Sequence, residues 1–193
     1  EGVVNQTEAF VQWFGNIWYN TNIDCLGQND PVSMLMDNIE LKPKRILEIG
    51  CANGWRLKLL KEKYGCETFG IDPSRKAIEA GGGDKENLFV GTADGKLTIL
   101  GTFDVIIYGF CFAFIDPSLY FKVLMMGDQA LEDGGIVFLH DRIAAFPVKH
   151  RYSNVKLKGG DIFESYLFSM DFLRLWLAHP FYTRIHEIKN PDT

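Results

Sequence analysis

Residues 46–54, with the sequence Ile-Leu-Glu-Ile-Gly-Cys-Ala-Asn-Gly, are the stretch that decides the fold. An apolar run ends in a glycine turn, and residues 55–60 after the turn place their apolar side chains at helical spacing. A strand, a glycine turn and a helix in this order form a small-molecule site at the carboxyl end of a strand in an α/β sheet. The stretch therefore predicts an α/β fold with a ligand site at residues 50–54.

Glu48, just before the turn, narrows the ligand class. A phosphate-binding loop would place a Lys and then a Ser or Thr after the glycines, and that pair does not stand here. A dinucleotide fingerprint would need a further glycine where this chain has Ala52 between Gly50 and Gly54. A carboxylate repels a pyrophosphate but attracts an amino group, so the stretch favours S-adenosylmethionine over a nucleotide phosphate.

The whole chain has 193 residues and a formal net charge of −5, which suits one domain with a full core. The acidic balance argues against nucleic acid and anionic membranes as partners, because phosphate contacts need clustered Lys and Arg. The one basic run, Lys149-His150-Arg151, is predicted to be a solvated hairpin face. The four cysteines lack metal-site spacing and indicate packing in a reducing compartment, so we expect a cytoplasmic protein without a metal.

Strands and helices alternate regularly after residue 44. The predicted strands are 45–49, 66–71, 87–91, 103–108 and 135–139. The predicted helices between them are 55–64, 74–80 and 117–131, the last with Asp116 as its N-cap. This alternation is typical of a Rossmann-like, doubly wound and mostly parallel sheet with helices on both faces.

We expect one domain over residues 1–193, built in three parts. Residues 1–40 form an N-terminal helical lid with helices over 6–19 and 31–40, and residues 41–141 form the cofactor-binding core. Residues 142–193 are expected to extend the sheet and to form the acceptor side. The elements predicted there are a hairpin over 147–158 with Ser153-Asn154 at its tip, a helix over 161–178 and a final strand over 181–189.

Three acids stand at the carboxyl ends of successive predicted strands. Glu48 ends the first, Asp72 ends the second at 22 residues beyond Gly50, and Asp94 follows the third. An acid at about 20 residues beyond the glycine turn is placed to accept both hydroxyls of a ribose. Asp94, one strand further out, is placed to accept a hydrogen bond from an adenine amino group. Asp104 opens its strand and therefore lies at the opposite end of the sheet.

At this point the sequence resembles the class I S-adenosylmethionine-dependent methyltransferases. The stretches that carry the resemblance are 48–54, 70–74, 91–94 and 103–109, which match the ordered motifs of that family over roughly residues 40–141. One departure is Ala52, where the family usually has Gly, and an ordinary φ at this residue would widen the turn. A weaker resemblance, in the aromatic residues near the N-terminus and in the tail, is to methyltransferases of sugar and nonulosonic-acid pathways.

The resemblance implies a set of cofactor-binding residues. Glu48 and the turn would hold the methionyl end, Asp72 the ribose, Asp94 the adenine, and residues 108–110 the floor of the methionyl arm. The full set is Glu48, Gly50, Cys51, Asn53, Gly54, Asp72, Pro73, Ala93, Asp94, Tyr108, Gly109 and Phe110.

The acceptor side is predicted from His140 and Asp141, which end the fifth strand. A neutral histidine suits a general base for an oxygen or nitrogen nucleophile, and the aspartate suits catalysis or metal binding. The alternative is that the pair merely caps the strand. The residues that could line the acceptor or close over the cofactor are Trp18, Tyr19, Asn20, His150 and Tyr152, although helical spacing also allows the aromatic ones to pack on the sheet.

We therefore predict an S-adenosylmethionine-dependent methyltransferase that acts on an oxygen or nitrogen of a small molecule, as a monomer or homodimer. The first alternative is a non-catalytic protein that binds S-adenosylmethionine or S-adenosylhomocysteine, which would lack a polar acceptor pocket. The second is a nicotinamide-dependent oxidoreductase, which Glu48 and the missing middle glycine disfavour.

Overall fold

The computed structural model describes residues 6–27, 30–81, 85–144, 146–156 and 162–188. Its centre is a five-stranded sheet with the order β3-β2-β1-β4-β5, in which every pair of neighbours is parallel. The strands are β1 Arg45–Ile49, β2 Glu67–Asp72, β3 Leu88–Val90, β4 Phe103–Gly109 and β5 Leu131–His140. The strand order reverses between β1 and β4, so a ligand is expected in the crevice at their carboxyl ends.

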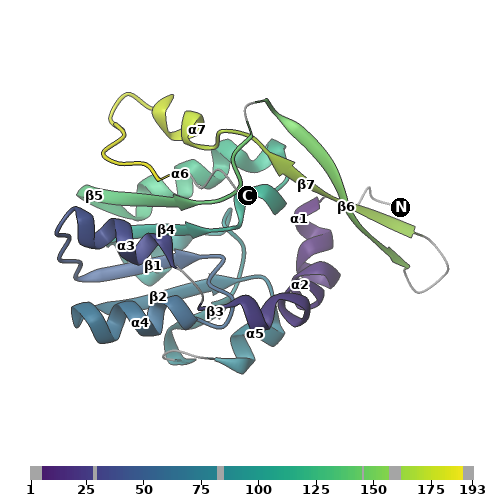
Figure 1. Cartoon of the computed structure of the whole chain (residues 1–193), viewed down its shortest axis with the longest axis horizontal. Coiled ribbons are helices and arrows are strands. Elements are labelled where there is room, and N and C mark those ends of the chain that lie inside the picture. The colour runs from purple at the N-terminus through teal and green to yellow at the C-terminus, as the bar shows by residue number, and fades with distance from the viewer. Residues whose placement is uncertain (1–5, 28–29, 82–84, 145, 157–161, 189–193) are drawn as a thin grey trace.

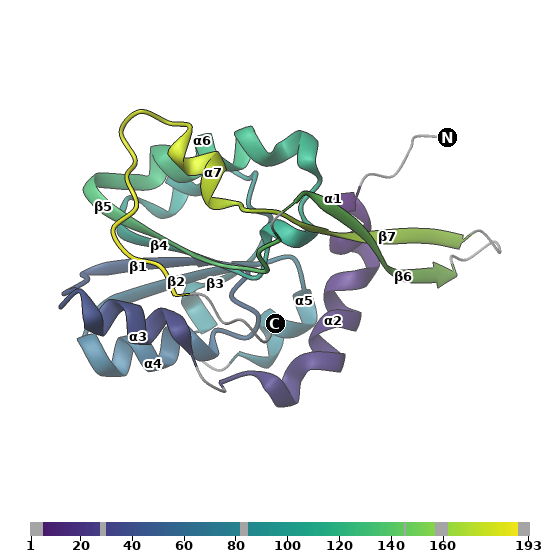
Figure 2. The ribbon, with the colours of Figure 1, turned by 45° about the horizontal axis from the view of Figure 1, so that its top comes forward.

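Helices cover both faces of this sheet, which confirms the predicted doubly wound fold. Figures 1 and 2 place α3 (Pro31–Asn38) and α4 (Trp55–Tyr64) on one face and α6 (Tyr120–Ala130) and α7 (Leu173–Leu177) on the other. Short elements complete this part of the chain: α5 Arg75–Ala80, η3 Lys85–Asn87, η4 Leu97–Leu100, η5 Phe112–Phe114 and η6 Pro117–Leu119.

Local chemistry sets where these helices begin and end. Asp30 caps α3 by accepting from the backbone N–H groups of Val32 and Ser33, as its place before Pro31 predicts. Gly54 and Gly65 stand at the two ends of α4 with positive φ, a conformation that costs glycine least. The predicted helix 117–131 is split, because Asp116 caps the short turn η6 before α6 begins.

The N-terminal segment is helical from Gln6 to Cys25 and lies across the carboxyl end of the sheet (Figures 1 and 2). It consists of α1 Gln6–Ala9, the π-helix η1 Phe10–Phe14, α2 Gly15–Asn22 and the short turn η2 Ile23–Cys25. Gly15 allows a close approach, since a Cβ there would lie 3.4 Å from the backbone nitrogen of Ser74. The predicted helix over 6–19 is thus confirmed, and it continues through 22.

The tail folds differently from the prediction. β6 (Val148–Lys156) and β7 (Ile162–Ser169) pair in a separate antiparallel two-stranded sheet that projects as an arm in Figures 1 and 2. The predicted hairpin tip at Ser153-Asn154 is wrong, because both residues lie inside β6. Among the described residues, no segment after His140 joins the central sheet, so the predicted extension of that sheet is wrong as well.

The predicted helix over 161–178 is also wrong, because a strand occupies its first half. Short apolar runs fit both the helical and the strand period, so periodicity alone could not separate them. Across the strand pair, the ammonium of Lys149 lies 3.7 Å from the ring centroid of Tyr166, a contact that only the paired strands create. Residues 182–188, predicted as a strand, have no regular structure.

Gly127 shows how tightly α6 packs on the sheet. A Cβ at this position would clash with the hydroxyl of Tyr108 and lie 3.2 Å from the ring of Trp176. We expect Gly127→Ala to destabilise the fold by about 1–3 kcal/mol through overpacking, although Ala is the better helix residue by about 1 kcal/mol. Urea denaturation measures this difference.

The control is Tyr108→Phe combined with Gly127→Ala. Removing the hydroxyl makes room for the new Cβ and loses only a long hydrogen bond of 3.4 Å to the carbonyl of Val123. The double variant should therefore regain most of the lost stability. A Gly127→Ala variant that is more stable than the original chain would contradict this packing.

Candidate functional site

The glycine turn after β1 is compressed between two neighbouring strands. The backbone N–H groups of Gly50 and Cys51 both donate to the carbonyl of Ile71, at 2.8 and 3.2 Å. Gly50 has φ +80°, and a Cβ on it would lie 2.5 Å from the carbonyl oxygen of Gly109. Only glycine fits this position without moving β4.

The expected ordinary φ of Ala52 is wrong. This residue has φ +50°, in the left-handed region, rather than an ordinary φ. The conformation costs a non-glycine residue about 1–2 kcal/mol. It also aims the backbone N–H of Ala52 at the Asp72 carboxylate, where the two atoms form a 2.9 Å hydrogen bond. The turn therefore keeps the left-handed shape that a glycine would adopt at this position.

Asp72 connects the turn after β1 to the start of α5. One carboxylate oxygen accepts from Ala52 and the other from the N–H of Ser74 at 2.8 Å. Burial raises the pKa of Asp72 to about 6, against the effect of these two hydrogen bonds. A carboxylate offers about four lone-pair positions, so Asp72 keeps acceptor capacity for a ligand.

A cavity of about 70 Å³ lies where the N-terminal helices meet the carboxyl end of the sheet. Among its lining residues are seven of the predicted cofactor residues: Gly50, Asp72, Pro73, Ala93, Asp94, Gly109 and Phe110. The N-terminal segment supplies the opposite wall, with Thr7, Phe10, Val11, Gly15 and Trp18. The structure thus brings together the predicted ribose, adenine and methionyl-arm positions under a helical cover.

Asp94 lines this cavity, and its carboxylate is part of an ion pair. Its carboxylate forms a 2.9 Å ion pair with Lys122 on α6. Burial raises the pKa of Asp94, but hydrogen bonds from Lys122 and Thr92 outweigh burial, so the pKa lies below its ordinary value. Asp94 is therefore an ionised acceptor at the end of the cavity where the sequence predicts the adenine.

The other five predicted cofactor residues do not line the cavity. Tyr108 is fully buried against Phe112 on the opposite face of the sheet, and Cys51 is buried behind Gly70. Asn53 accepts from the N–H of Trp55 at 3.3 Å at the start of α4. Gly54 and Glu48 likewise lie outside the lining.

Glu48 belongs instead to a buried ionic cluster that the sequence analysis missed. Arg56, the second residue of α4, is 3% exposed and donates from Nη1 to Oε1 of Glu48. Its Nε forms a 2.8 Å ion pair with Asp30, and its Nη2 lies 3.1 Å from Nδ1 of His140. One cation thus links α4, β1, the start of α3 and the end of β5.

The position of Arg56 in the sequence indicates that such a cluster exists. A cation in the first turn of a helix faces the positive end of the helix dipole and is unfavourable unless acids compensate. The first turn of α4 itself contains no acid. Arg56 therefore implied carboxylates from elsewhere, and Glu48 and Asp30 are those carboxylates.

The position of Glu48 changes how it can act on a ligand. A Cβ on Gly109 would lie 2.7 Å from Oε1 of Glu48, so the carboxylate sits directly behind the backbone of Gly109 that lines the cavity. Its second oxygen, Oε2, is buried and has no hydrogen-bond partner among the described residues. Burial raises the pKa of Glu48 to about 7, although the Arg56 cation opposes the shift.

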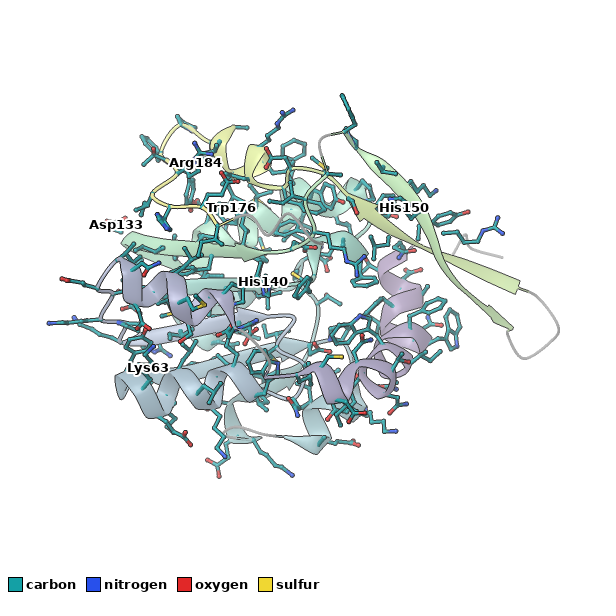
Figure 3. The ribbon with its side chains drawn as sticks, viewed as in Figure 1. Lys63, Asp133, His140, His150, Trp176 and Arg184 are labelled. Carbon is teal, nitrogen blue, oxygen red and sulfur yellow. The ribbon has the colours of Figure 1, made fainter. Side chains whose placement is uncertain are left out.

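His140 ends β5 and lies near the centre of the molecule in Figure 3, and Asp141 directly follows it in the chain. The His140 ring contacts the ring of Phe110, with centroids 4.1 Å apart. Burial and the neighbouring Arg56 cation lower the pKa of His140 to about 4, against the effect of Asp30.

Asp141 is held by backbone donors. Its carboxylate oxygens accept from the N–H groups of Arg142, at 2.8 Å, and Ala113, at 3.3 Å. Burial raises the pKa of Asp141 to about 7. A carboxylate with such a pKa can exchange a proton near neutral pH.

The predicted acceptor-side residues are not all brought together. Trp18 lines the cavity, and Tyr19 is buried beside Ala52 with a hydroxyl that has no partner among the described residues. Asn20 is exposed on α2. His150 is exposed on the arm, away from His140 in Figure 3, and the side chain of Tyr152 lies outside the described part.

None of the helices in the described residues combines the length and apolar character that a membrane crossing requires. No group of three or more His, Cys, Asp or Glu side chains in those residues is arranged to hold a metal ion.

The fold and the cavity together define a class I methyltransferase type of α/β domain. A family model described as a methyltransferase domain matches residues 29–190. The chain belongs to this methyltransferase family, which confirms the predicted family. A comparison with curated protein sequences finds no match.

Solved structures of methyltransferases have the same fold. The DhpI–SAH complex aligns with a TM-score of 0.62 at 14% identity, covering 92% of this chain and 86% of DhpI. A TehB-like SAM-dependent methyltransferase from Corynebacterium glutamicum aligns with a TM-score of 0.54 at 16% identity, covering 84% and 99%.

A third structure is larger than this chain. The plantazolicin methyltransferase BpumL, in complex with a pentazolic desmethylPZN analog and SAH, aligns with a TM-score of 0.55 at 21% identity and 70% coverage of this chain. The chain spans 58% of the length of BpumL.

The raised pKa of Asp72 has a consequence for stability. Between its ordinary value of 3.8 and the folded value of about 6, the folded chain holds more protons than the unfolded chain. Stability contributed by Asp72 is therefore present at low pH and falls as the pH rises through this window. Relative to Asp72→Asn, the free energy of unfolding of the original chain should fall by up to about 3 kcal/mol across it.

Urea denaturation of both proteins at a series of pH values measures this difference. The free energies of unfolding of the two proteins should also differ by an amount that does not depend on pH, because the Asn amide cannot accept from both Ala52 and Ser74. A difference that stays flat across the window would contradict the buried, proton-holding state of Asp72.

Proposed function

We propose that this chain is an S-adenosylmethionine-dependent methyltransferase that methylates an oxygen or nitrogen of a small molecule. The observation that carries the proposal is Asp72, a buried carboxylate with spare acceptor capacity in the wall of a cavity at the switch point. The family match supports the activity class. The SAH in the DhpI and BpumL structures supports the cofactor.

The polar groups of the cavity fit this cofactor. Asp72 would accept from the ribose hydroxyls, and Asp94 with Ala93 would border the adenine. The backbone of Gly50 and Gly109 would border the methionyl arm. The cofactor supplies an activated methyl group on a sulfonium, and Trp18 and Phe110 offer aromatic surface in the same cavity.

Glu48 acts on this site from behind the backbone. Its carboxylate lies directly behind the backbone of Gly109, and its negative charge would attract the cationic amino group of the methionyl end. The unpartnered hydroxyl of Tyr19, packed beside Ala52, is a donor available to the carboxylate of that end.

The small volume of the cavity favours a movement of the N-terminal helices when the cofactor binds. Small-molecule sites usually enclose about 300–1,000 Å³, whereas this cavity encloses about 70 Å³. The wall that can move is the N-terminal segment α1–η1–α2, because the opposite wall of the cavity belongs to the central sheet. We propose that this segment is the lid, which opens to admit the cofactor and then closes over it.

The acceptor side of the proposal rests on His140 and Asp141. Methyl transfer mainly needs the nucleophile, the methyl carbon and the sulfur in line, with a group that takes the proton of the nucleophile. The pKa of Asp141, about 7, suits that proton. A non-catalytic binder would have an apolar wall here, so this polar pair favours an enzyme.

Several finer points stay predictions. These are the choice between oxygen and nitrogen, the small-molecule class of the acceptor, the cytoplasmic location and the monomeric or homodimeric state. A transfer assay with labelled S-adenosylmethionine against hydroxylated and aminated metabolites tests the first two. Binding of labelled NAD without binding of S-adenosylmethionine would favour the oxidoreductase alternative.

Calorimetry with S-adenosylhomocysteine tests the cofactor site directly. Asp72→Ala should weaken binding about tenfold or more, because it removes hydrogen bonds to a charged acceptor. The matched control is Asp133→Ala, which removes an exposed acid on β5 outside the cavity and should bind like the original chain. Equal affinity of Asp72→Ala and Asp133→Ala would remove Asp72 from the ribose site.

A further inference from the structure

The contact between Arg56 and His140 determines which ring nitrogen of the histidine carries the proton. A guanidinium has only N–H donors and keeps its proton. Its Nη2 lies 3.1 Å from Nδ1 of His140, so Nδ1 has to accept and must present its lone pair. In the neutral ring the proton is then on Nε2, the other nitrogen.

Arg56 is itself held too firmly to release this contact easily. Its Nε is paired with Asp30 at 2.8 Å and its Nη1 with Glu48, and its side chain is 4% exposed. Three partners from three different elements therefore fix the plane of the guanidinium. Nη2 is the guanidinium nitrogen that takes part in neither ion pair, and it is the one that contacts His140.

The other side of the His140 ring is available to a ligand. The residue is half-buried, and within the described residues Nε2 has no hydrogen-bond partner. The ring is supported by Phe110, which is 40% exposed and lines the cofactor cavity. His140 is not itself a lining residue of the cavity, but it reaches the cavity wall through its contact with Phe110.

We propose that His140 binds the acceptor as a hydrogen-bond donor through Nε2–H, with Arg56 as the positioning residue that sets this tautomer. The proposal rests on the proposed function and replaces the role of general base for His140. A ring whose exposed nitrogen already carries a proton cannot take one there. The depressed pKa of His140 agrees, because the ring then stays neutral at physiological pH.

The same cluster indicates the chemistry of the acceptor. The Arg56 cation is offset by Asp30 and Glu48, so no excess positive charge lies behind His140. A neutral oxygen lone pair, as in a carbonyl, hydroxyl or ether, suits this donor better than a carboxylate. The bound oxygen should stand beside the nucleophile, since a donor on the nucleophile itself would weaken it.

Nitrogen-15 NMR of the SAH-bound chain tests the tautomer without any acceptor. His140→Gln assigns the His140 signals among the four histidines. We expect a protonated Nε2, an unprotonated Nδ1, and no titration of the ring down to about pH 5, since the pKa is about 4. A protonated Nδ1, or titration near the ordinary value of about 6.5, would overturn the proposal.

The role of Arg56 is tested by the same spectra. Glu48→Gln combined with Arg56→Met removes the pair and leaves Asp30 with only its two backbone donors at the start of α3, and it should let both tautomers appear and the pKa of His140 rise. Lys58→Met, an exposed change on the same helix, should leave the signals unchanged. If the double variant keeps the same tautomer, Arg56 is not the positioning residue. If the double variant does not fold, the spectrum of the original chain still shows which tautomer His140 has.

Activity separates a donor from a base, with the acceptor that the labelled-cofactor assay identifies. Gln keeps an N–H near the place of Nε2 but cannot take a proton, whereas Ala keeps neither. We expect His140→Gln to stay within about threefold of the original kcat/KM and His140→Ala to lose about tenfold or more. Equal losses in both variants, or no loss in either, would contradict the donor role.

These outcomes are distinguishable from failure of the proposed function. If SAH does not bind in calorimetry, the cofactor assignment fails while the tautomer is still measured in the free chain. If SAH binds and the tautomer is the opposite one, the proposal for His140 fails and the methyltransferase assignment stands.

Discussion

The buried guanidinium of Arg56 is the interaction on which the rest of the site depends. It joins Asp30, Glu48 and His140, which come from the start of α3, from β1 and from the end of β5. Buried charges are costly unless they are paired and hydrogen-bonded, so each partner needs the others in place. The cluster therefore ties β1, which leads into the proposed cofactor turn, to the end of β5, the proposed acceptor side, through one buried side chain.

The turn itself depends on a second set of buried contacts. Gly50 fits between Ile71 and Gly109, and Ala52 adopts a left-handed φ so that its N–H reaches Asp72. Asp72 then spans from this turn to Ser74. The carboxylate that is proposed to hold the ribose is thus also the one that fixes the shape of the turn, and its burial there raises its pKa against the effect of these hydrogen bonds.

The central fold was predictable because its signals are local. The run before Gly50, the helix stop at Gly65, the N-cap at Asp116, and the acids at the ends of successive strands each act within a few residues of sequence. The sheet order and the cavity at its carboxyl end follow from these elements, and seven of the twelve predicted cofactor residues line that cavity.

The remaining features depend on contacts between distant residues. The strand β7 was mistaken for a helix because residues 162–169 fit both periods, and only pairing with β6 selects the strand. The cluster of Arg56 was missed because its acids are 26 and 8 residues away. Tyr108 has the right position in the motif, but the pleat turns its side chain to the other face of the sheet, against α6.

The most direct test of this account is the stability of Arg56→Met measured against Lys58→Met. Both replace a cation by Met on the same helix, but Arg56 is buried and Lys58 is exposed. The account predicts that Arg56→Met lowers the free energy of unfolding by about 3–5 kcal/mol, because Glu48 and Asp30 lose their partner, while Lys58→Met changes it by about 0.5 kcal/mol or less. Equal stability of the two variants in urea denaturation would contradict the central role of Arg56.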